Sequence, residues 1–325
     1  MRAVWYERQG PAAEVLQVGE LADPEPADGE VRVRVLLSGV NPGDVRKRED
    51  SFGHGMAHPR VVPHSDGMGV VDRVGPGVDP ARLGSRVWLW GAQSYRAFGT
   101  AADLVVVPEH LAVALPDEVD DELAACLGIP GITAHRCILG DGPVAGRTVL
   151  VHGLLGGVAS MAAALARRDG ATVIGTVRRT TDLAEAEGLA DHVVALDDDP
   201  AGRVRSLAPR GVDRVVEVAL AANLDLDRQV LAQHGVISAY ASDQPEVVLP
   251  FWPMLFDNLS LRLVGSDDFT PAQREAAVAD LTAAAAEGWL RPRIAEPLPL
   301  EQCARAHDLV AAGSRERQLL RVQQP

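Results

Sequence analysis

The chain has 325 residues, which is enough for two domains and a large buried core. Hydrophobic residues make up 47% and charged residues 23%, a balance that excludes a disordered, collagenous or coiled-coil protein. The net charge of -14 repels phosphate backbones and anionic lipid, so neither nucleic acid nor a membrane surface is expected as a partner.

The three cysteines are too few and too widely spaced for a disulfide framework or a four-thiolate zinc site. The N-terminal sequence MRAVWYERQG lacks the apolar segment of a secretion signal, and no window reaches about 18 uninterrupted apolar residues. We therefore expect a cytoplasmic protein.

From Met1 to about Asp117 the sequence consists of short apolar runs separated by turn residues, a pattern typical of strands. The expected strands are residues 2–6, 31–37, 69–75, 86–90 and 103–108. This part predicts a β-rich lobe with irregular connections.

Beyond residue 117, strands alternate with helical stretches at the spacing of βαβ units. We expect strands over 147–153, 171–177, 191–197, 213–219, 235–241 and 261–267. Most are almost continuously apolar, so they predict an α/β fold with a Rossmann-type, doubly wound parallel sheet. Helices over 270–290 and 301–313 follow, then a strand over 318–322, and both helices are expected to pack back onto the first lobe.

The strongest local motif is a glycine-rich turn between a strand that ends at Val151 and the helix after it. Glycines permit unusual φ values and let backbone N–H groups approach a pyrophosphate, to which the helix N-terminus adds partial positive charge. The expected cofactor-binding residues here are Gly153, Gly156, Gly157, Val158 and Ala159. The alternative is an ordinary α/β connection that required glycine.

The next strand indicates which dinucleotide to expect. An NAD site carries an acidic residue about 20 residues beyond the glycines, whereas a basic residue accommodates the 2'-phosphate of NADP. Here Thr176 stands at that position, and Arg178 and Arg179 follow without a carboxylate. These three candidate cofactor-binding residues favour NADPH, with two merely solvated arginines as the alternative.

Several segments resemble, in this order, the quinone oxidoreductase (zeta-crystallin-like) branch of the medium-chain dehydrogenase/reductase superfamily. They are MRAVWYERQGPAAEVLQVGE, GEVRVRVLLSGVNPGD, VVPHSDGMGVVDRVGPGV, SRVWLW, LGIPGITAH and the glycine turn. The resemblance implies a GroES-like catalytic domain of residues 1–117 and 263–325, with a Rossmann NADPH-binding domain of residues 118–262 inserted in it. It also implies an active site in the cleft between the domains, and a homodimer.

Many members of this superfamily are zinc alcohol dehydrogenases, whose catalytic zinc needs three protein ligands, typically Cys and His. Where the family carries these ligands, the chain has Asn41, Ser65 followed by Asp66, and Ile129. Three histidines also lie close together in the sequence: His54, His58 and His64. Because loop histidines are more often exposed than metal-bound, we interpret them as exposed loop residues. No metal is therefore expected.

Without zinc to polarise an alcohol, hydride delivery from NADPH to an acceptor that is already electrophilic remains feasible, and quinones and conjugated enones are such acceptors. In the family, the Asn and Asp of the NPxD segment lie beside the nicotinamide, which implies catalytic roles for Asn41 and Asp44. Asn41 would contact the cofactor and donate to a developing oxyanion, and Asp44 would orient it or relay a proton. On local sequence alone, NPGD is a plain turn.

Other candidates follow from position. Thr133 matches a family threonine near the cofactor, with a helix hydroxyl as the alternative. Ala219, Tyr240 and Ala241 lie at carboxyl ends of expected strands, where open α/β sheets bind ligands. Tyr240 is a candidate for cofactor contact or proton donation, and equally a buried structural tyrosine.

Three departures from the family pattern bear on the substrate and the cofactor. Arg46 replaces a common tyrosine, and a cation there would favour an anionic or phenolate-bearing acceptor unless it belongs to a solvated charge run. Phe52 is a candidate wall of the acceptor site or an ordinary packing aromatic. Leu154 and Leu155 are bulkier than the small residues usual in the turn, so reduced cofactor affinity is a possible outcome.

The sequence thus predicts a zinc-independent, NADPH-dependent oxidoreductase that transfers hydride to a quinone. Two alternatives stay open: an enone or enoyl reductase in a tailoring pathway, and a catalytically impaired binding protein with the same fold.

Overall fold

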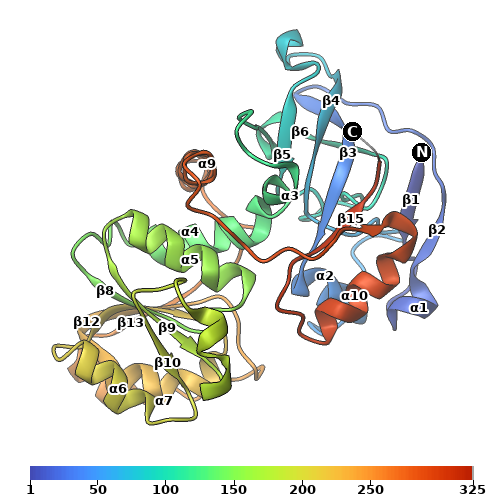
Figure 1. The fold of residues 1–325 in the computed structure, drawn as a ribbon. Coiled ribbons are helices and arrows are strands. Elements are labelled where there is room, and N and C mark those ends of the chain that lie inside the picture. The colour runs from blue at the N-terminus through green and yellow to red at the C-terminus, as the bar shows by residue number, and fades with distance from the viewer. Residues whose placement is uncertain (324–325) are drawn as a thin grey trace. The chain divides into compact units, whose positions relative to one another are not determined.

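The computed structural model describes residues 1–323, in which the chain forms two compact units. Unit 1 combines Met1–Pro130 with the chain from Pro292 onward, and unit 2 is Gly131–Arg291. In Figure 1, unit 1 therefore carries both the blue N-terminal part and the red C-terminal end of the chain. Within the described range, no helix has the length and apolar character needed to cross a lipid bilayer.

Unit 1 is organised around the long strand β3 (Glu30–Val40), whose residues Val31, Val33 and Val35 are fully buried. The sheet order is β14-β15-β3-β4-β5-β7, and β6 also pairs with β3. The other strands are β4 (Asp66–Val74), β5 (Arg86–Leu89), β6 (Leu104–Pro108), β7 (Ala112–Ala114), β14 (Leu298–Pro299) and β15 (Gln318–Arg321). β1 (Arg2–Trp5) and β2 (Gln17–Glu20) form a separate antiparallel pair. All the strands expected in this lobe are present.

The helices of unit 1 are α1 (Ala12–Val15), α2 (Pro42–Glu49), α3 (Asp121–Ala124) and α10 (Cys303–Ala311). α10 packs against α1, α2 and β15, which confirms that the helix expected over 301–313 returns to the first lobe. β15 runs antiparallel to β3, so distant parts of the chain complete one sheet.

Unit 2 contains a six-stranded sheet in the order β10-β9-β8-β11-β12-β13, and every neighbouring pair is parallel. The strands are β8 (Thr148–Val151), β9 (Thr172–Val177), β10 (His192–Ala195), β11 (Val212–Glu217), β12 (Leu231–Ala239) and β13 (Ser260–Leu263). They confirm all six expected strands and the doubly wound topology. The order steps outward from β8 in one direction and from β11 in the other, and such a switch point is where open α/β sheets bind ligands.

Helices cover both faces of this sheet. The helices of unit 2 are α4 (Ile132–Leu139), α5 (Gly157–Arg168), α6 (Pro200–Leu207), α7 (Leu220–Val230), α8 (Phe251–Phe256) and α9 (Pro271–Ala286). Figure 1 shows α4 and α5 on one face and α6 and α7 on the other, and α4 packs on α5 as α6 packs on α7.

The helix α9 corrects the expectation that residues 270–290 pack onto the first lobe. It packs against α4 in unit 2, where Leu281 fills the space beside Gly131 and His135 Nε2 lies 2.9 Å from Asp280 Oδ2. The apolar face of an alanine-rich helix consists of small side chains and can pack on many surfaces. The sequence of α9 therefore did not indicate which surface it packs on. The units accordingly divide after residues 130 and 291, whereas the expected domain boundaries were after 117 and 262.

Candidate functional site

The glycine turn joins β8 to α5. Gly153 has φ +69°, which favours glycine, and the N–H of Gly156 donates to the Gly153 carbonyl at 2.8 Å. Gly156 is the N-cap of α5, where no side chain caps the helix. The first N–H groups of an α-helix have no partner within the helix, so this end has the properties of an anion-binding site. Ala159 is fully buried, as close packing of α5 on the sheet requires.

The bulk of Leu154 is accommodated inside unit 2. Leu154 is fully buried, and its side chain occupies the space beside Gly175 of β9, where a Cβ atom would overlap it. The leucine therefore faces the sheet, and the structure gives no reason for Leu154 to obstruct a dinucleotide. Leu155 is half-buried.

The predicted cofactor-binding residues at the end of β9 differ in their exposure to solvent. Thr176 is fully buried, and its hydroxyl accepts a hydrogen bond from the Gly153 N–H at 3.3 Å. Arg178 and Arg179 are exposed, and among the described residues neither guanidinium has a hydrogen-bond or ion-pair partner. The two arginines are thus available to an anionic ligand, whereas Thr176 lies beneath the turn.

The remaining unit 2 candidates surround the ends of β11 and β12. Thr133 is buried in α4, and the Leu220 N–H donates to the Ala241 carbonyl at 3.3 Å just after Ala219. Burial, followed by the nearby Cys137 and Glu217, raises the pKa of Tyr240. A phenol held in its neutral form suits a hydrogen-bonding role better than proton release.

Asn41 is the N-cap of α2 and is almost fully buried. The Asp44 carboxylate accepts a hydrogen bond from the Asn41 backbone N–H at 2.7 Å, which fixes the first turn of the helix. The Asn41 amide is held from both ends: Nδ2 donates to Asp66 Oδ2 at 2.6 Å, and Oδ1 accepts from Arg317 Nη1 at 2.9 Å. Its orientation is therefore fixed before any ligand binds.

Asp66 and Arg317 were not predicted as functional residues. Asp66 is fully buried, accepts a hydrogen bond from the Ile129 N–H at 2.7 Å and lies 3.6 Å from Arg317 Nη2. Burial raises the pKa of Asp66 to about 7, against the opposing effects of Arg317, Asn41 and Ile129. In the sequence Asp66 stood out only as a departure from a zinc-ligand pattern, and nothing marked Arg317, which is 276 residues from Asn41.

The two predicted substrate residues, Arg46 and Phe52, are exposed. Arg46 lies in α2, and Phe52 follows that helix and stacks on His54 with ring centroids 6.4 Å apart. Their roles toward an acceptor stay predictions.

The residues around Asn41 do not form a fitting zinc site. The donor set is one amide and one carboxylate, and both already contact the guanidinium of Arg317, a fixed cation that opposes a second one. Burial raises the pKa of the neighbouring Cys126 to about 11, so this residue keeps its proton at neutral pH.

His64 was expected to be an exposed loop residue, but it is fully buried in unit 1. With Cys303 and His307 it brings three potential ligand atoms within 4.8 Å of one another. Arg48 Nε donates to His307 Nδ1 at 3.4 Å, so the other ring nitrogen of His307 carries the proton and donates to His64 Nε2 at 2.9 Å. A metal on His307 Nε2 would place an N–H directly against Arg48. The group is therefore better satisfied as a hydrogen-bonded chain.

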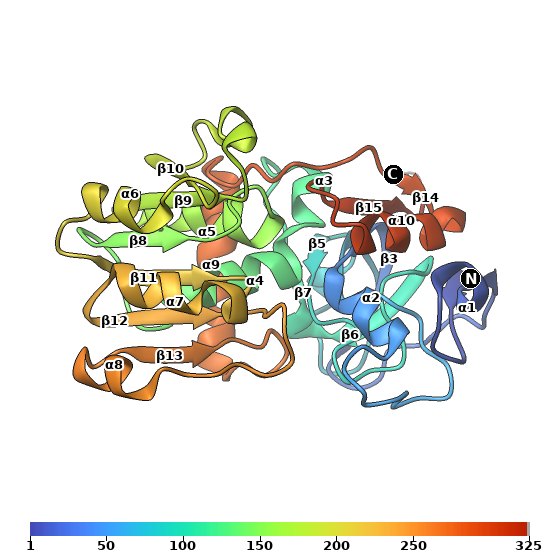
Figure 2. The same ribbon diagram turned by 90° about the horizontal axis from the view of Figure 1, so that it is seen from below.

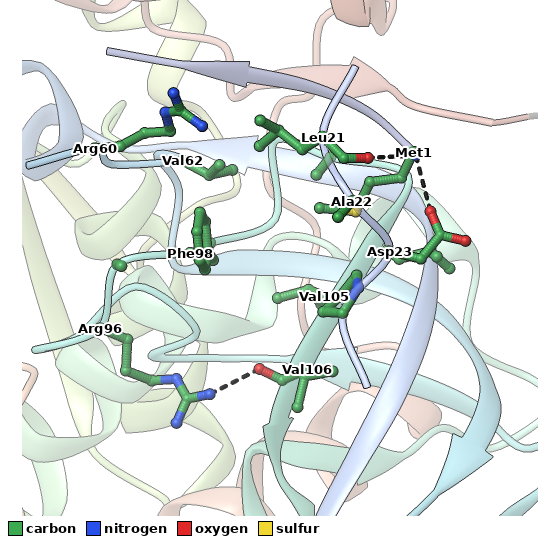
Figure 3. Close-up of a pocket in the computed structure, with 15 residues that line it drawn as sticks. Met1, Leu21, Ala22, Asp23, Arg60, Val62, Arg96, Phe98, Val105 and Val106 are labelled. Atoms are coloured by element: carbon green, nitrogen blue, oxygen red, sulfur yellow. Dashed lines mark hydrogen bonds and ion pairs between the residues drawn. The ribbon is translucent and has the colours of Figure 1, made fainter. Parts of the chain in front are cut away.

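Unit 1 contains a cavity of about 590 Å³, whose lining residues are drawn in Figure 3. Its wall is mainly apolar and includes Phe98, with Arg60 and Arg96 beside it. Arg60 pairs with Glu7 at 2.6 Å and Arg96 donates to the Val106 carbonyl at 2.8 Å, so both cations are engaged. Of the predicted site residues, all of which the structure describes, none lines this cavity.

Two family models match the chain. Residues 27–117 match the alcohol dehydrogenase GroES-like domain, and residues 157–283 match the zinc-binding dehydrogenase model. The donor set around Asn41 does not fit the metal that the second description names.

Individual proteins are similar over almost the whole chain. A quinone oxidoreductase from Lama guanicoe is 30% identical, with 95% of this chain and 93% of the relative covered. A mycobacterial protein solved in complex with NADPH has a TM-score of 0.85 at 27% identity, covering 99% of this chain and 100% of the other. A solved NAD-dependent alcohol dehydrogenase has a TM-score of 0.87 at 28% identity, with the same coverage. The first of these structures contains NADPH, and the second protein is described as NAD-dependent. The choice of nucleotide for this chain therefore has to be argued from its own residues.

Proposed function

The chain belongs to the quinone oxidoreductase branch of the medium-chain dehydrogenase/reductase superfamily, a family of oxidoreductases, and from this we propose that it is a zinc-independent enzyme that reduces quinones with NADPH. Hydride from NADPH and one proton from solvent convert the quinone into a hydroquinone and leave NADP⁺. Unit 2 supplies the nucleotide-binding residues, and unit 1 supplies the group around Asn41.

The observation that carries the choice of cofactor is the pair Arg178 and Arg179 at the carboxyl end of β9. Both are exposed and unpaired in the described structure, and no carboxylate takes the position that would hold a ribose diol. The uncapped N-terminus of α5 is suited to the pyrophosphate. The mycobacterial complex with NADPH supports the same choice.

The group around Asn41 supports an electrophilic acceptor. An amide fixed by Asp66 and Arg317 is a preorganised donor for an oxygen that gains negative charge, and one Nδ2 hydrogen is left after the bond to Asp66. The guanidinium adds a fixed positive charge nearby. Such a site stabilises the product oxyanion of a carbonyl-type acceptor without activating an alcohol.

Turnover of chelator-dialysed protein tests the proposal. We expect NADPH oxidation coupled to hydroquinone formation, with a rate unchanged by dialysis against a zinc chelator, because no zinc ligand set is present around Asn41. Loss of activity that added zinc restores would contradict zinc independence. A saturated ketone formed from an enone, with quinones left unreduced, would favour the enone reductase, and failure to bind either dinucleotide would favour the binding protein.

We also propose a homodimer formed through the edge of unit 2. β13 is the last strand of the sheet, and Figure 2 shows α8 beside it. Phe251, Trp252 and Phe256 of α8 are each more than 60% exposed, and Leu263 at the end of β13 is 73% exposed. An apolar helix beside an open strand edge is suited to a second copy, because two such edges can pair antiparallel about a two-fold axis.

Replacing Trp252 with aspartate is expected to convert the dimer into a monomer, because it places charge at the centre of this apolar surface. Light scattering coupled to gel filtration measures the mass. Trp289→Asp is the matched control, since Trp289 is a partly exposed tryptophan just after α9, and it should leave the dimer intact. A monomeric parent protein, or a dimeric Trp252→Asp variant, would contradict this interface.

The cysteines support a cytoplasmic location as part of the proposal. Cys126, Cys137 and Cys303 are free and buried. Burial raises the pKa of each thiol, to about 11 for Cys126 and about 12 for Cys137, so all three are protonated and unreactive. A chain of this kind is typical of a reducing compartment.

A further inference from the structure

A buried polar group lies directly beneath the glycine turn. His152 follows β8, Thr176 belongs to β9, Glu217 ends β11 and Asp227 lies on α7, and all four are fully buried. Thr176 was predicted to contact the nucleotide, and the other three were not predicted at all. Burying four polar side chains is costly in free energy unless they are hydrogen-bonded.

The hydrogen bonds of this group form a continuous path from α7 to the turn. Asp227 Oδ1 accepts from His152 Nε2 at 2.8 Å, and His152 Nδ1 lies 3.0 Å from the Thr176 hydroxyl. The Thr176 hydroxyl in turn accepts from the Gly153 N–H at 3.3 Å, while the Thr176 carbonyl accepts from the Leu154 N–H at 2.9 Å. Two consecutive peptide groups of the turn are thus attached to one residue of β9.

The charges of the group keep this path in place. Burial alone would lower the pKa of His152, but the carboxylates of Asp227 and Glu217 outweigh it and raise that pKa. The Nε2–H of His152 therefore remains a donor to Asp227. Glu217 extends the support to the other side of the switch point, because its carboxylate accepts from the Ala219 N–H and from Asn223 Nδ2.

We infer that Asp227 and His152 are positioning residues for the cofactor, which act by holding Thr176 against the glycine turn and so fix the N–H groups that bind the pyrophosphate. The inference rests on the proposed function, since it assumes that the turn binds a dinucleotide. It assigns Thr176 a place behind the turn instead of a direct contact with the ribose.

A positioning role predicts a different effect on the affinities for NADPH and NADH than the loss of Arg178 and Arg179 does. The pyrophosphate is common to NADPH and NADH, so a loosened turn weakens both by the same factor. A residue that contacts the ribose or its 2'-phosphate changes the ratio of the two affinities instead.

The test is fluorescence titration of Thr176→Val with both dinucleotides. Valine keeps the shape of threonine but removes the hydroxyl, so we expect both dissociation constants to rise about tenfold, the effect of losing one buried hydrogen bond of the usual strength. Their ratio should stay within about twofold of the parent value. Thr176→Ser restores the hydroxyl and should restore both affinities, and Asp227→Asn should weaken both several-fold.

The control is Val204→Ala, which removes methyl groups from the buried core of the same unit and lowers the melting temperature without touching the turn. It should leave both dissociation constants unchanged. If Thr176→Val fails to fold, Asp227→Asn carries the test alone. Unchanged affinities in the folded variants, or a loss confined to NADPH, would overturn the inference, whereas a parent protein that binds neither dinucleotide would overturn the proposed function.

Discussion

Replacing Arg178 and Arg179 together with alanine is expected to abolish the preference for NADPH over NADH. Both guanidiniums are exposed and unpaired at the end of β9, so the 2'-phosphate would be their first strong partner. Charge-assisted hydrogen bonds of this kind contribute about 1.5–3 kcal/mol each, which corresponds to a factor of about 10 to 100 in affinity. The dissociation constant for NADPH should rise at least about tenfold, and the dissociation constant for NADH should change by less than about threefold.

Arg210→Ala provides the matched control, because Arg210 is also exposed in unit 2 but lies before β11, at the opposite ends of the strands. It removes one positive charge far from the switch point and should leave both constants unchanged. Titration at two salt concentrations separates a specific phosphate contact from general attraction. An unchanged ratio of the two constants in the double variant would refute the assignment of these arginines.

Replacing Asn41 with alanine is expected to lower kcat for quinone reduction by about 100-fold, the usual effect of removing one oxyanion donor. The effect should appear in kcat as well as in kcat/KM, because the acceptor oxygen gains its negative charge during hydride transfer and does not carry it in the bound quinone. The variant also leaves Asp66 and Arg317 without their common partner, so a lower melting temperature is expected as well.

A helix-cap variant separates these two consequences. The Thr270 hydroxyl caps α9 by accepting a hydrogen bond from the Gln273 N–H, and Thr270→Ala should cost about 1 kcal/mol of stability while leaving kcat unchanged. Steady-state kinetics at saturating NADPH, with thermal denaturation of the same samples, measures both quantities. A value of kcat within threefold of the parent in Asn41→Ala would show that its amide does not act on the acceptor.

Patterns that are local in the sequence predicted the structure well. The parallel strands of unit 2 are short apolar runs between turns, and the β8–α5 connection needs its glycines whatever surrounds it. The predicted fold class is therefore confirmed for the described residues. The packing of α9 could not be predicted in the same way, because its partner surface on α4 is formed by residues far away in sequence.

The site was predictable only in part, for the same reason. Asn41 and the two arginines belong to short motifs, whereas the contact between Asn41 and Arg317 exists only after β15 has paired with β3. The side-chain directions were equally hidden: Leu154 fits into the space left by Gly175, and the Thr176 hydroxyl supports the turn from below. Both depend on the pairing of β8 with β9, which places Leu154 beside Gly175 and Thr176 beneath the turn.

The pairing of β15 with β3 has a consequence for synthesis on the ribosome. Residues 131–291 leave the ribosome as one continuous stretch, so all of unit 2 is available for folding. At that stage β6 already pairs with residues 30–34 of β3, but residues 37–40 still lack a neighbour on the same side. Residues 37–40 of β3 are paired only when residues 318–321 arrive, and the Asn41 amide acquires its guanidinium partner only when residue 317 arrives. A nascent chain interrupted before that point would have a complete unit 2, but the group around Asn41 would still lack Arg317.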